Sequence, residues 1–257
     1  MNANNTSSMP TGCEGCRNVS ALGFDFAMAF QPIVQVSNRT VFAHEALVRG
    51  LGGEGAQSIL SQVTEQNRYS FDQTCRVKAI EQASELGMKS MLSINFLPNA
   101  VYRAEACIRL TLATAKKCAF PAEQIMFEVT ESEQSSDLAH LKSIFRDYEQ
   151  RGFTTAIDDF GAGYAGFDFL VEFVPDIIKI DMALLRGIDA HRERQIVVSG
   201  IVRICNELGV RVLAEGVETR AEFDFLRTLE IDLFQGYLFA KPAFRALPLV
   251  DWAAVGM

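Results

Sequence analysis

The segment Thr154–Gly163, with the sequence TTAIDDFGAG, carries the most informative pattern of this chain. A short apolar run ends in two adjacent aspartates, Asp158 and Asp159, and a glycine-rich stretch follows at once. Two neighbouring carboxylates repel each other and lose hydration when they are buried, so they need a positive charge close by. A divalent metal ion is the usual source of that charge. The segment therefore predicts a strand that ends in metal ligands.

The same layout recurs along the chain, because other apolar runs also end or nearly end in oxygen-bearing side chains. These residues are Glu45, Asn95, Glu128 and Glu215. Any one of them could instead cap the helix that follows. One such residue on each of several successive strands favours a metal site at one rim of a barrel. Carboxylate and amide oxygens, without imidazole or thiolate ligands, favour Mg²⁺ or Mn²⁺.

Strand-like and helical stretches alternate after an opening hairpin. The strand-like runs Phe26–Val36 and Val41–Arg49 are separated by only four residues, so the first two strands should be antiparallel. Further strands are predicted at Met91–Asn95, Ile125–Thr130, Thr154–Asp158, Ile177–Ile180, Val210–Ala214 and Leu233–Gln235. Helices are predicted at Gln57–Gln66, Phe71–Leu86, Glu105–Lys117, Asp137–Arg151, Phe167–Phe173, Glu193–Leu208 and Arg220–Leu229. This order predicts an α/β fold, a TIM-like (β/α)8 barrel with an antiparallel first strand.

Composition limits the class of protein. A length of 257 residues is ordinary for one such barrel, and we expect one domain at 23–257 after a flexible tail at 1–22, which is rich in Asn, Ser, Thr and Gly. The net charge of −8 argues against a broad basic surface for DNA. No apolar stretch is long enough to cross a membrane, and the first residues lack the apolar core of a signal peptide. These features predict a cytoplasmic protein.

The cysteine and histidine residues give weaker signals. Cys13 and Cys16 have the spacing of half a zinc site or of a redox pair, but no second Cys/His pair stands nearby, which favours two free thiols in the tail. Alternate strand residues share a face, so Glu45, Leu47 and Arg49 should point together, while His44 points outward as a structural residue.

Eight short motifs, taken in order, resemble the EAL-domain cyclic di-GMP phosphodiesterases. The naming motif is Glu45–Arg49, with the sequence EALVR. The supporting motifs are Gln31-Pro32-Ile33, Ser93-Ile94-Asn95, Phe127–Glu131, Asp158–Gly161, Ile178–Asp181, Ala214–Glu218 and Gln235-Gly236-Tyr237. Each motif alone is weak, but the ordered set covers about residues 24–245.

The resemblance implies a site that holds two metal ions. The implied metal ligands are Glu45, Asn95, Glu128, Asp158, Asp159 and Glu215. The implied catalytic residues are Lys179, Glu215, Asp159 and Glu131, where Lys179 lies near the attacking water and Glu131 anchors the loop after Asp159. The implied substrate-binding residues are Gln31, Leu47, Arg49, Asp181, Glu218 and Gln235.

The resemblance also implies an activity and partners. We expect a metal-dependent hydrolase in bacterial signal transduction that opens cyclic di-GMP to linear pGpG with Mg²⁺ or Mn²⁺, and that is inhibited by Ca²⁺. We also expect a homodimer and a separate sensor or regulatory partner. The alternative is a catalytically silent module that binds cyclic di-GMP or a protein. Such modules usually lack several metal ligands, whereas this chain retains all of those implied by the family.

Overall fold

The computed structural model describes residues 22–101, 103–130, 138–162 and 167–256 of the chain. The predicted tail, including Cys13 and Cys16, lies outside these residues apart from Leu22, which packs against the core. No helix within the described ranges is long and apolar enough to cross a membrane.

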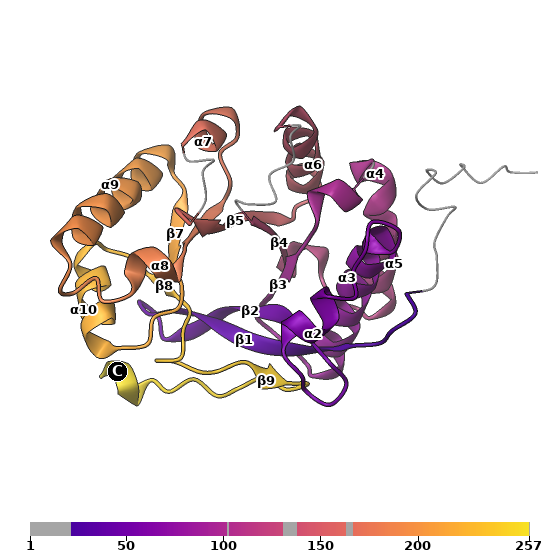
Figure 1. The fold of residues 1–257 in the computed structure, drawn as a ribbon, viewed down its shortest axis with the longest axis horizontal. Helices are drawn as coiled ribbons and strands as arrows, with labels where there is room; N and C mark the ends of the chain where they lie inside the picture. The colour runs from indigo at the N-terminus through magenta and orange to yellow at the C-terminus, as the bar shows by residue number, and fades with distance from the viewer. Residues whose placement is uncertain (1–21, 102, 131–137, 163–166, 257) are drawn as a thin grey trace, which may run out of the picture.

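A closed barrel of strands forms the centre of the fold, and Figure 1 views it along the barrel opening. The strands are β1 (Ala27–Gln35), β2 (Thr40–Arg49), β3 (Met91–Asn95), β4 (Ile125–Thr130), β5 (Thr154–Phe160), β6 (Ile177–Ile180), β7 (Arg211–Ala214) and β8 (Leu233–Phe234). Neighbouring strands from β2 to β8 are parallel, and β1 closes the ring between β8 and β2. The predicted barrel is therefore confirmed.

The opening hairpin sets the direction of β1. Ala27 pairs with Arg49 and Gln35 pairs with Thr40, so β1 is antiparallel to β2, as the short connection predicts. β1 is also antiparallel to β8 and to the short strand β9 (Ala243–Phe244), which the sequence did not reveal.

Helices flank most of the strand ring in Figure 1, whereas β9 and the C-terminal segment run beside β1. The helices are α2 (Ala56–Leu60), α3 (Arg68–Glu85), α4 (Ala104–Cys107), α5 (Arg109–Lys117), α6 (Leu138–Gln150), α7 (Asp168–Glu172), α8 (Met182–Leu185), α9 (Arg192–Leu208) and α10 (Arg220–Thr228). Short 3₁₀ turns lie at Pro98–Ala100, Ala122–Gln124 and Ala253–Val255.

Two helix predictions differ from the structure. α2 is shorter than the predicted Gln57–Gln66, because Asn67 accepts a hydrogen bond from Thr64 N and donates one to Gln62 O in place of helical hydrogen bonds. The predicted helix at Glu105–Lys117 is divided into α4 and α5 at the fully buried Ile108.

The barrel interior contains a compact layer of apolar side chains, which we call the apolar plug. Its members are Ile33, Ala43, Met126, Ala156, Ile177, Leu213 and Leu233, and they form a core cluster separate from the larger one. Alternate residues share a strand face. The residue two positions further along each of these strands, or two positions earlier on the reversed β1, therefore points into the same interior, one layer nearer the rim.

Candidate metal centre

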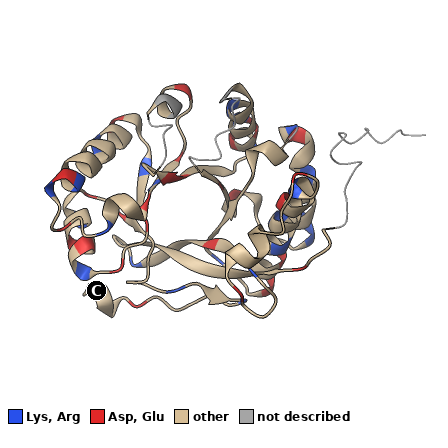
Figure 2. Ribbon diagram, viewed as in Figure 1, with Lys and Arg blue, Asp and Glu red and all other residues tan. Residues whose placement is uncertain are grey.

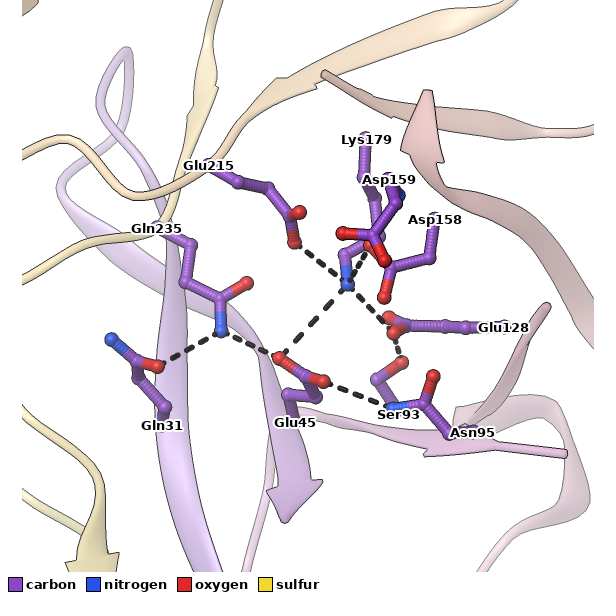
Figure 3. A network of polar contacts seen from close by, with 10 residues as sticks. All are labelled: Gln31, Glu45, Ser93, Asn95, Glu128, Asp158, Asp159, Lys179, Glu215 and Gln235. Atoms are coloured by element: carbon purple, nitrogen blue, oxygen red, sulfur yellow. Dashed lines mark hydrogen bonds and ion pairs between the residues drawn. The ribbon is translucent and has the colours of Figure 1, made fainter. Parts of the chain in front are cut away.

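The layer above the apolar plug is polar on every strand, and we call it the polar layer. It draws one or two residues from each strand or from the position directly after it: Gln31, Glu45, Ser93, Asn95, Glu128, Asp158, Lys179, Glu215 and Gln235. Figure 3 shows these side chains converging from all sides of the barrel. Figure 2 shows acidic positions on several of the barrel strands, whereas most Lys and Arg residues lie on the surrounding helices.

Lys179 lies at the centre of the polar layer. Its Nζ is 2.7 Å from Glu128 Oε2, 2.9 Å from Asp158 Oδ1 and 2.7 Å from Glu215 Oε1. Glu45 Oε2 lies further away, at 3.9 Å. The positive charge beside Asp158 in the described residues is thus a lysine, and several carboxylates share it.

A second group of hydrogen bonds fixes Glu45. Asn95 Nδ2 donates to Glu45 Oε1 at 3.0 Å, and Gln235 Nε2 donates to Glu45 Oε2 at 2.7 Å. Gln235 Nε2 also lies 3.3 Å from Gln31 Oε1. The carboxylate of Glu45 is therefore oriented by the amide of Asn95 at the end of β3 and by that of Gln235, directly after β8, which in turn contacts Gln31 on β1.

Two groups of carboxylates could each hold a metal ion. Glu45, Glu128 and Asp158 form one group, and Asp158, Asp159 and Glu215 form the other; within each, the oxygens lie within 4.8 Å of one another. Asp158 belongs to both groups. All the donors are oxygens, which suits Mg²⁺ and Mn²⁺. The carboxylates of the two groups carry more negative charge than the single positive charge of Lys179 can balance. In addition, Gln235 Oε1 is buried and has no hydrogen-bond partner among the described residues. Both observations fit metal binding at this site.

The backbone at Asp159 explains how two adjacent carboxylates reach one site. Neighbours on a regular strand point to opposite faces. Asp159 has φ of 55°, a left-handed conformation that Asp tolerates better than most residues, and the register of β5 with β6 shifts between Ile157 and Phe160. This irregularity brings Asp159 to the same side as Asp158.

The pKa directions reflect the crowding of like charges. Burial raises the pKa of Glu128 to about 8 and that of Glu215 well above its ordinary value. Burial and repulsion by Asp158 raise the pKa of Asp159 to about 6. Burial opposes ionisation of Asp158, but the contact with Lys179 outweighs it and lowers the pKa of Asp158. Protons thus stabilise this cluster, and divalent cations could replace them.

Lys179 remains a cation in this environment. Burial alone would lower its pKa, but Asp158, Glu128 and Glu215 raise the pKa well above the ordinary lysine value. A lysine of this kind cannot accept a proton at neutral pH, so its chemistry is that of a fixed positive charge and a hydrogen-bond donor.

The predicted substrate-binding residues occupy different positions relative to the polar layer. Gln31, Gln235, Asp181 and Glu218 line the same open cavity as the carboxylates. Leu47 and Arg49, at the end of β2, are half-buried and are not among the described residues that line it. The last predicted residue, Glu131, lies outside the described residues, as does most of the loop that it was expected to anchor.

Two rim residues also have structural roles. Asp181 caps α8 by accepting a hydrogen bond from Ala183 N at 2.8 Å, which is the alternative role that strand-end polar residues often have. Glu218 is exposed and pairs with Arg186 at 2.8 Å. A Cβ on Gly236 would lie 2.0 Å from Val217 O, so glycine there allows the loops that carry Glu215 and Gln235 to approach each other.

Ser93 is a site residue that was not singled out from the sequence. Its hydroxyl donates a short hydrogen bond to Glu128 Oε1, on the side of that carboxylate opposite Lys179. The signal was present, because Ser93 precedes Asn95 by two residues and shares its strand face. His44 is buried and contacts Ser90 Oγ through Nδ1, consistent with the predicted structural role.

Comparisons with known proteins identify the family. The EAL domain profile matches residues 20–242. The antirepressor BluF of Escherichia coli, described as blue light- and temperature-regulated, is 34% identical over 226 residues, covering 87% of this chain and 56% of BluF. The cyclic di-GMP phosphodiesterase PdeB of Shewanella oneidensis is 28% identical over 62% of this chain and 18% of its own length. This chain thus spans about half of BluF and less than a fifth of PdeB.

Solved structures agree with this match. A standalone versatile EAL protein from Vibrio cholerae O395, in its c-di-GMP bound form, is 51% identical with a TM-score of 0.89, covering 92% of this chain and 100% of that one. BlrP1 of Klebsiella pneumoniae, in a manganese/cy-diGMP complex, is 34% identical with a TM-score of 0.81 over 87% of this chain and 57% of its own. With a closed barrel, a rim of convergent carboxylates and a profile match over most of its length, the chain belongs to the EAL domain family.

Proposed function

We propose that this protein is a phosphodiesterase that hydrolyses cyclic di-GMP to linear pGpG and depends on Mg²⁺ or Mn²⁺. The observation that carries the proposal is the pair of carboxylate groups that share Asp158 beside Lys179. Relatives named cyclic di-GMP phosphodiesterases, and EAL structures with cyclic di-GMP bound, support the choice of substrate. In the reaction, a water oxygen bonds to one phosphorus, the bond from that phosphorus to a ribose oxygen breaks, and a water proton ends on the ribose oxygen.

The proposed metal ligands are the acidic residues of the two groups, together with Asn95. Glu45, Asn95, Glu128 and Asp158 would hold one ion, and Asp158, Asp159 and Glu215 would hold the other. Bound divalent ions would supply Lewis-acid chemistry at the phosphate diester and lower the pKa of water. Structures of BlrP1 with cyclic di-GMP and either manganese or calcium support such a site in this family.

Lys179 would stabilise negative charge that develops during the reaction. It is buried and protonated, and its three N–H donors face Glu128, Asp158 and Glu215 in the structure. Metal ions bound to these carboxylates would release one of the three donors, which would then donate a hydrogen bond to the attacking water or to a phosphate oxygen.

The cavity wall would position the substrate. Gln31, Gln235, Asp181 and Glu218 offer amide and carboxylate groups around the carboxylate cluster. We assign the further substrate contacts to Leu47 and Arg49 at the end of β2, and the anchoring of the loop after Asp159 to Glu131. We also propose that the protein works in the cytoplasm as a homodimer under the control of a sensor or regulatory partner.

The second function is a catalytically silent module that binds cyclic di-GMP or a protein. One observation favours it: BluF, which this chain resembles over 87% of its length, is named an antirepressor. Every proposed metal ligand, including Asp159, is nevertheless present in this chain, which favours the enzyme.

The deciding experiment is incubation of the purified protein with cyclic di-GMP and Mn²⁺ or Mg²⁺, followed by chromatography of the nucleotides. The proposal expects linear pGpG to accumulate with either metal and not in excess chelator. Glu45→Gln is the matched control, because it keeps the size of a side chain that Asn95 and Gln235 orient and removes its charge. Binding of intact cyclic di-GMP without product would favour the silent module.

A further inference from the structure

A buried ion pair lies outside the barrel, in the layer between helices and strands. Arg76 and Asp72 are one turn apart on α3, their side chains are 0% exposed, and Arg76 Nη2 lies 2.9 Å from Asp72 Oδ2. Arg76 Nη1 donates to Tyr148 Oη on α6 at 2.8 Å. We call Asp72, Arg76 and Tyr148 the Arg76 cluster. Burying such a pair costs desolvation energy that apolar side chains of similar volume would avoid, so stability alone is a poor reason for it.

Two of the aromatic rings around Arg76 are sequence neighbours of proposed metal ligands. The guanidinium carbon lies 5.6 Å from the ring centroid of Phe96 and 5.1 Å from that of Phe127. Phe96 directly follows Asn95, and Phe127 directly precedes Glu128. Because neighbouring strand residues point to opposite faces, holding these rings on the outer face fixes the direction of Asn95 and Glu128 on the inner face.

The same cluster also reaches the backbone at the end of β3. Asp72 Oδ1 accepts a hydrogen bond from Leu97 N at 3.0 Å, two residues after Asn95. Phe96 N donates to Glu128 O at 2.9 Å, and Asn95 is the register partner of Glu128. One carboxylate thus holds the point where β3 leaves the sheet, and one guanidinium packs on the rings beside both ligands.

We propose that the Arg76 cluster is a positioning device that sets the geometry of Asn95 and Glu128 for metal binding. The inference rests on the proposed function, because it assigns those two residues to a metal ion. Its members are not among the described residues that line the carboxylate cavity, so they are positioning residues. Their burial, their cross-link between α3 and α6 and their backbone contact at Leu97 all act on the ends of β3 and β4.

The test replaces the whole cluster with apolar side chains of similar volume, in the variant Arg76→Met/Asp72→Leu/Tyr148→Phe. Removing both charges together leaves no unpaired buried ion, but Leu97 N and Gln73 Nε2 lose the acceptor that Asp72 supplies, so the thermal midpoint should fall modestly. The dissociation constant for Mn²⁺, measured by titration without substrate, should rise about tenfold, the lower end of the range for groups that orient metal ligands. Amide hydrogen exchange at Leu97 in the absence of metal should become faster.

Two further comparisons keep the result decisive. Arg76→Met/Asp72→Asn and Arg76→Met/Asp72→Leu both remove the ion pair without leaving an unpaired cation, but only Asn keeps an acceptor for Leu97 N. Mn²⁺ affinity should therefore be better preserved in the variant with Asn at position 72, and this pair decides the matter if the triple variant does not fold. Arg203→Met/Glu207→Leu removes an exposed pair of the same helical spacing on α9 and should leave Mn²⁺ binding unchanged.

Two results would overturn the inference: wild-type Mn²⁺ affinity and Leu97 exchange in the triple variant, or equal Mn²⁺ affinity in the two Asp72 variants. Failure of the proposed function looks different, because the wild type itself would then bind no Mn²⁺. In that case the exchange rate at Leu97 still decides whether the cluster fixes the end of β3.

Discussion

Ile177 and Lys179 are two residues apart on β6, point into the same barrel interior and are both buried, yet they belong to opposite environments. Ile177 lies in the apolar plug, where close packing holds the barrel together. Lys179 lies in the polar layer, where carboxylates surround one cation. The same step of two residues separates Met126 from Glu128 on β4. The apolar plug therefore stabilises the barrel, while the polar layer holds carboxylates close together where they can bind a cation.

The largest effect is expected for Lys179→Met, which removes the cation and keeps an unbranched side chain. Turnover should fall by about 10²–10³-fold, because a fixed donor to developing charge is lost. At pH 8 without metal, the free energy of unfolding should also fall by about 3–5 kcal/mol, because buried carboxylates lose their counter-charge. Urea unfolding with and without Mn²⁺ checks the second part; a loss that Mn²⁺ does not reduce would contradict the assigned role.

Ile177→Ala tests the other layer on the same strand. The free energy of unfolding should fall by about 2–5 kcal/mol, because a fully packed side chain leaves a cavity. This loss should be the same with and without Mn²⁺, and Mn²⁺ affinity should change little. A large loss of Mn²⁺ affinity in Ile177→Ala would contradict the division of roles between the apolar plug and the polar layer.

The third prediction adds metal to the wild type. At a hundredfold excess over its dissociation constant, Mn²⁺ should raise the free energy of unfolding by about 2.7 kcal/mol through binding to the folded state alone. Ca²⁺ should also stabilise the fold but should not support turnover, because its longer and looser coordination misplaces the reacting groups. Melting curves and nucleotide chromatography, run on the same samples with each ion, separate binding from catalysis. Efficient turnover with Ca²⁺ would contradict the expectation that its longer coordination distances misplace the reacting groups.

The sequence predicted the polar layer better than the apolar plug, for a physical reason. A carboxylate at the end of an apolar strand stands out, so its recurrence on successive strands made Glu45 and Glu128 candidates together, and the motif resemblance added Lys179. The strands are buried on both faces, so no alternation of polar and apolar residues shows which of Ile177 and Ile178 points inward. Only after Lys179 is placed does the period of two assign Ile177 to the plug.

Some features required the folded chain. The left-handed backbone at Asp159 and the hydrogen bond from Ser93 to Glu128 depend on contacts between strands. The Arg76 cluster was invisible as well, because a charged helix residue is usually exposed and only packing places Arg76 under Phe127. Helix ends were less certain than helix existence, as the short α2 shows.

A pH series sharpens the contrast further. Glu128 has a pKa raised from 4.5 to about 8, so its contribution to stability is complete below pH 4.5 and is lost as the pH rises towards 8. Asp159 contributes in the same direction up to about pH 6. Without metal, the melting temperature should therefore fall between pH 5 and 8 by a few degrees, and the fall should be smaller in Glu128→Gln. Ile177→Ala should instead keep the wild-type slope at a lower melting temperature.

The smallest effect is expected for removal of residues 1–20, because the residues that define both layers come from strands that begin at Ala27, or directly follow such a strand. The free energy of unfolding should change by less than about 0.5 kcal/mol, and turnover should stay the same. Inductively coupled plasma measurement of zinc in the full chain is the control. Stoichiometric zinc that is lost in Cys13→Ser/Cys16→Ser, or a marked drop in stability on truncation, would show that this segment supports the barrel.

The antiparallel direction of β1 determines on which side of the barrel a preceding domain would be attached. In an all-parallel barrel, the chain enters at the end opposite the catalytic rim. Here Ala27 is paired with Arg49, the last residue of β2, so the chain enters the barrel on the same side as the carboxylates. A domain joined directly ahead of Phe26 would therefore be attached at the carboxylate side of the barrel. An input signal could then act over a short distance, without crossing the barrel.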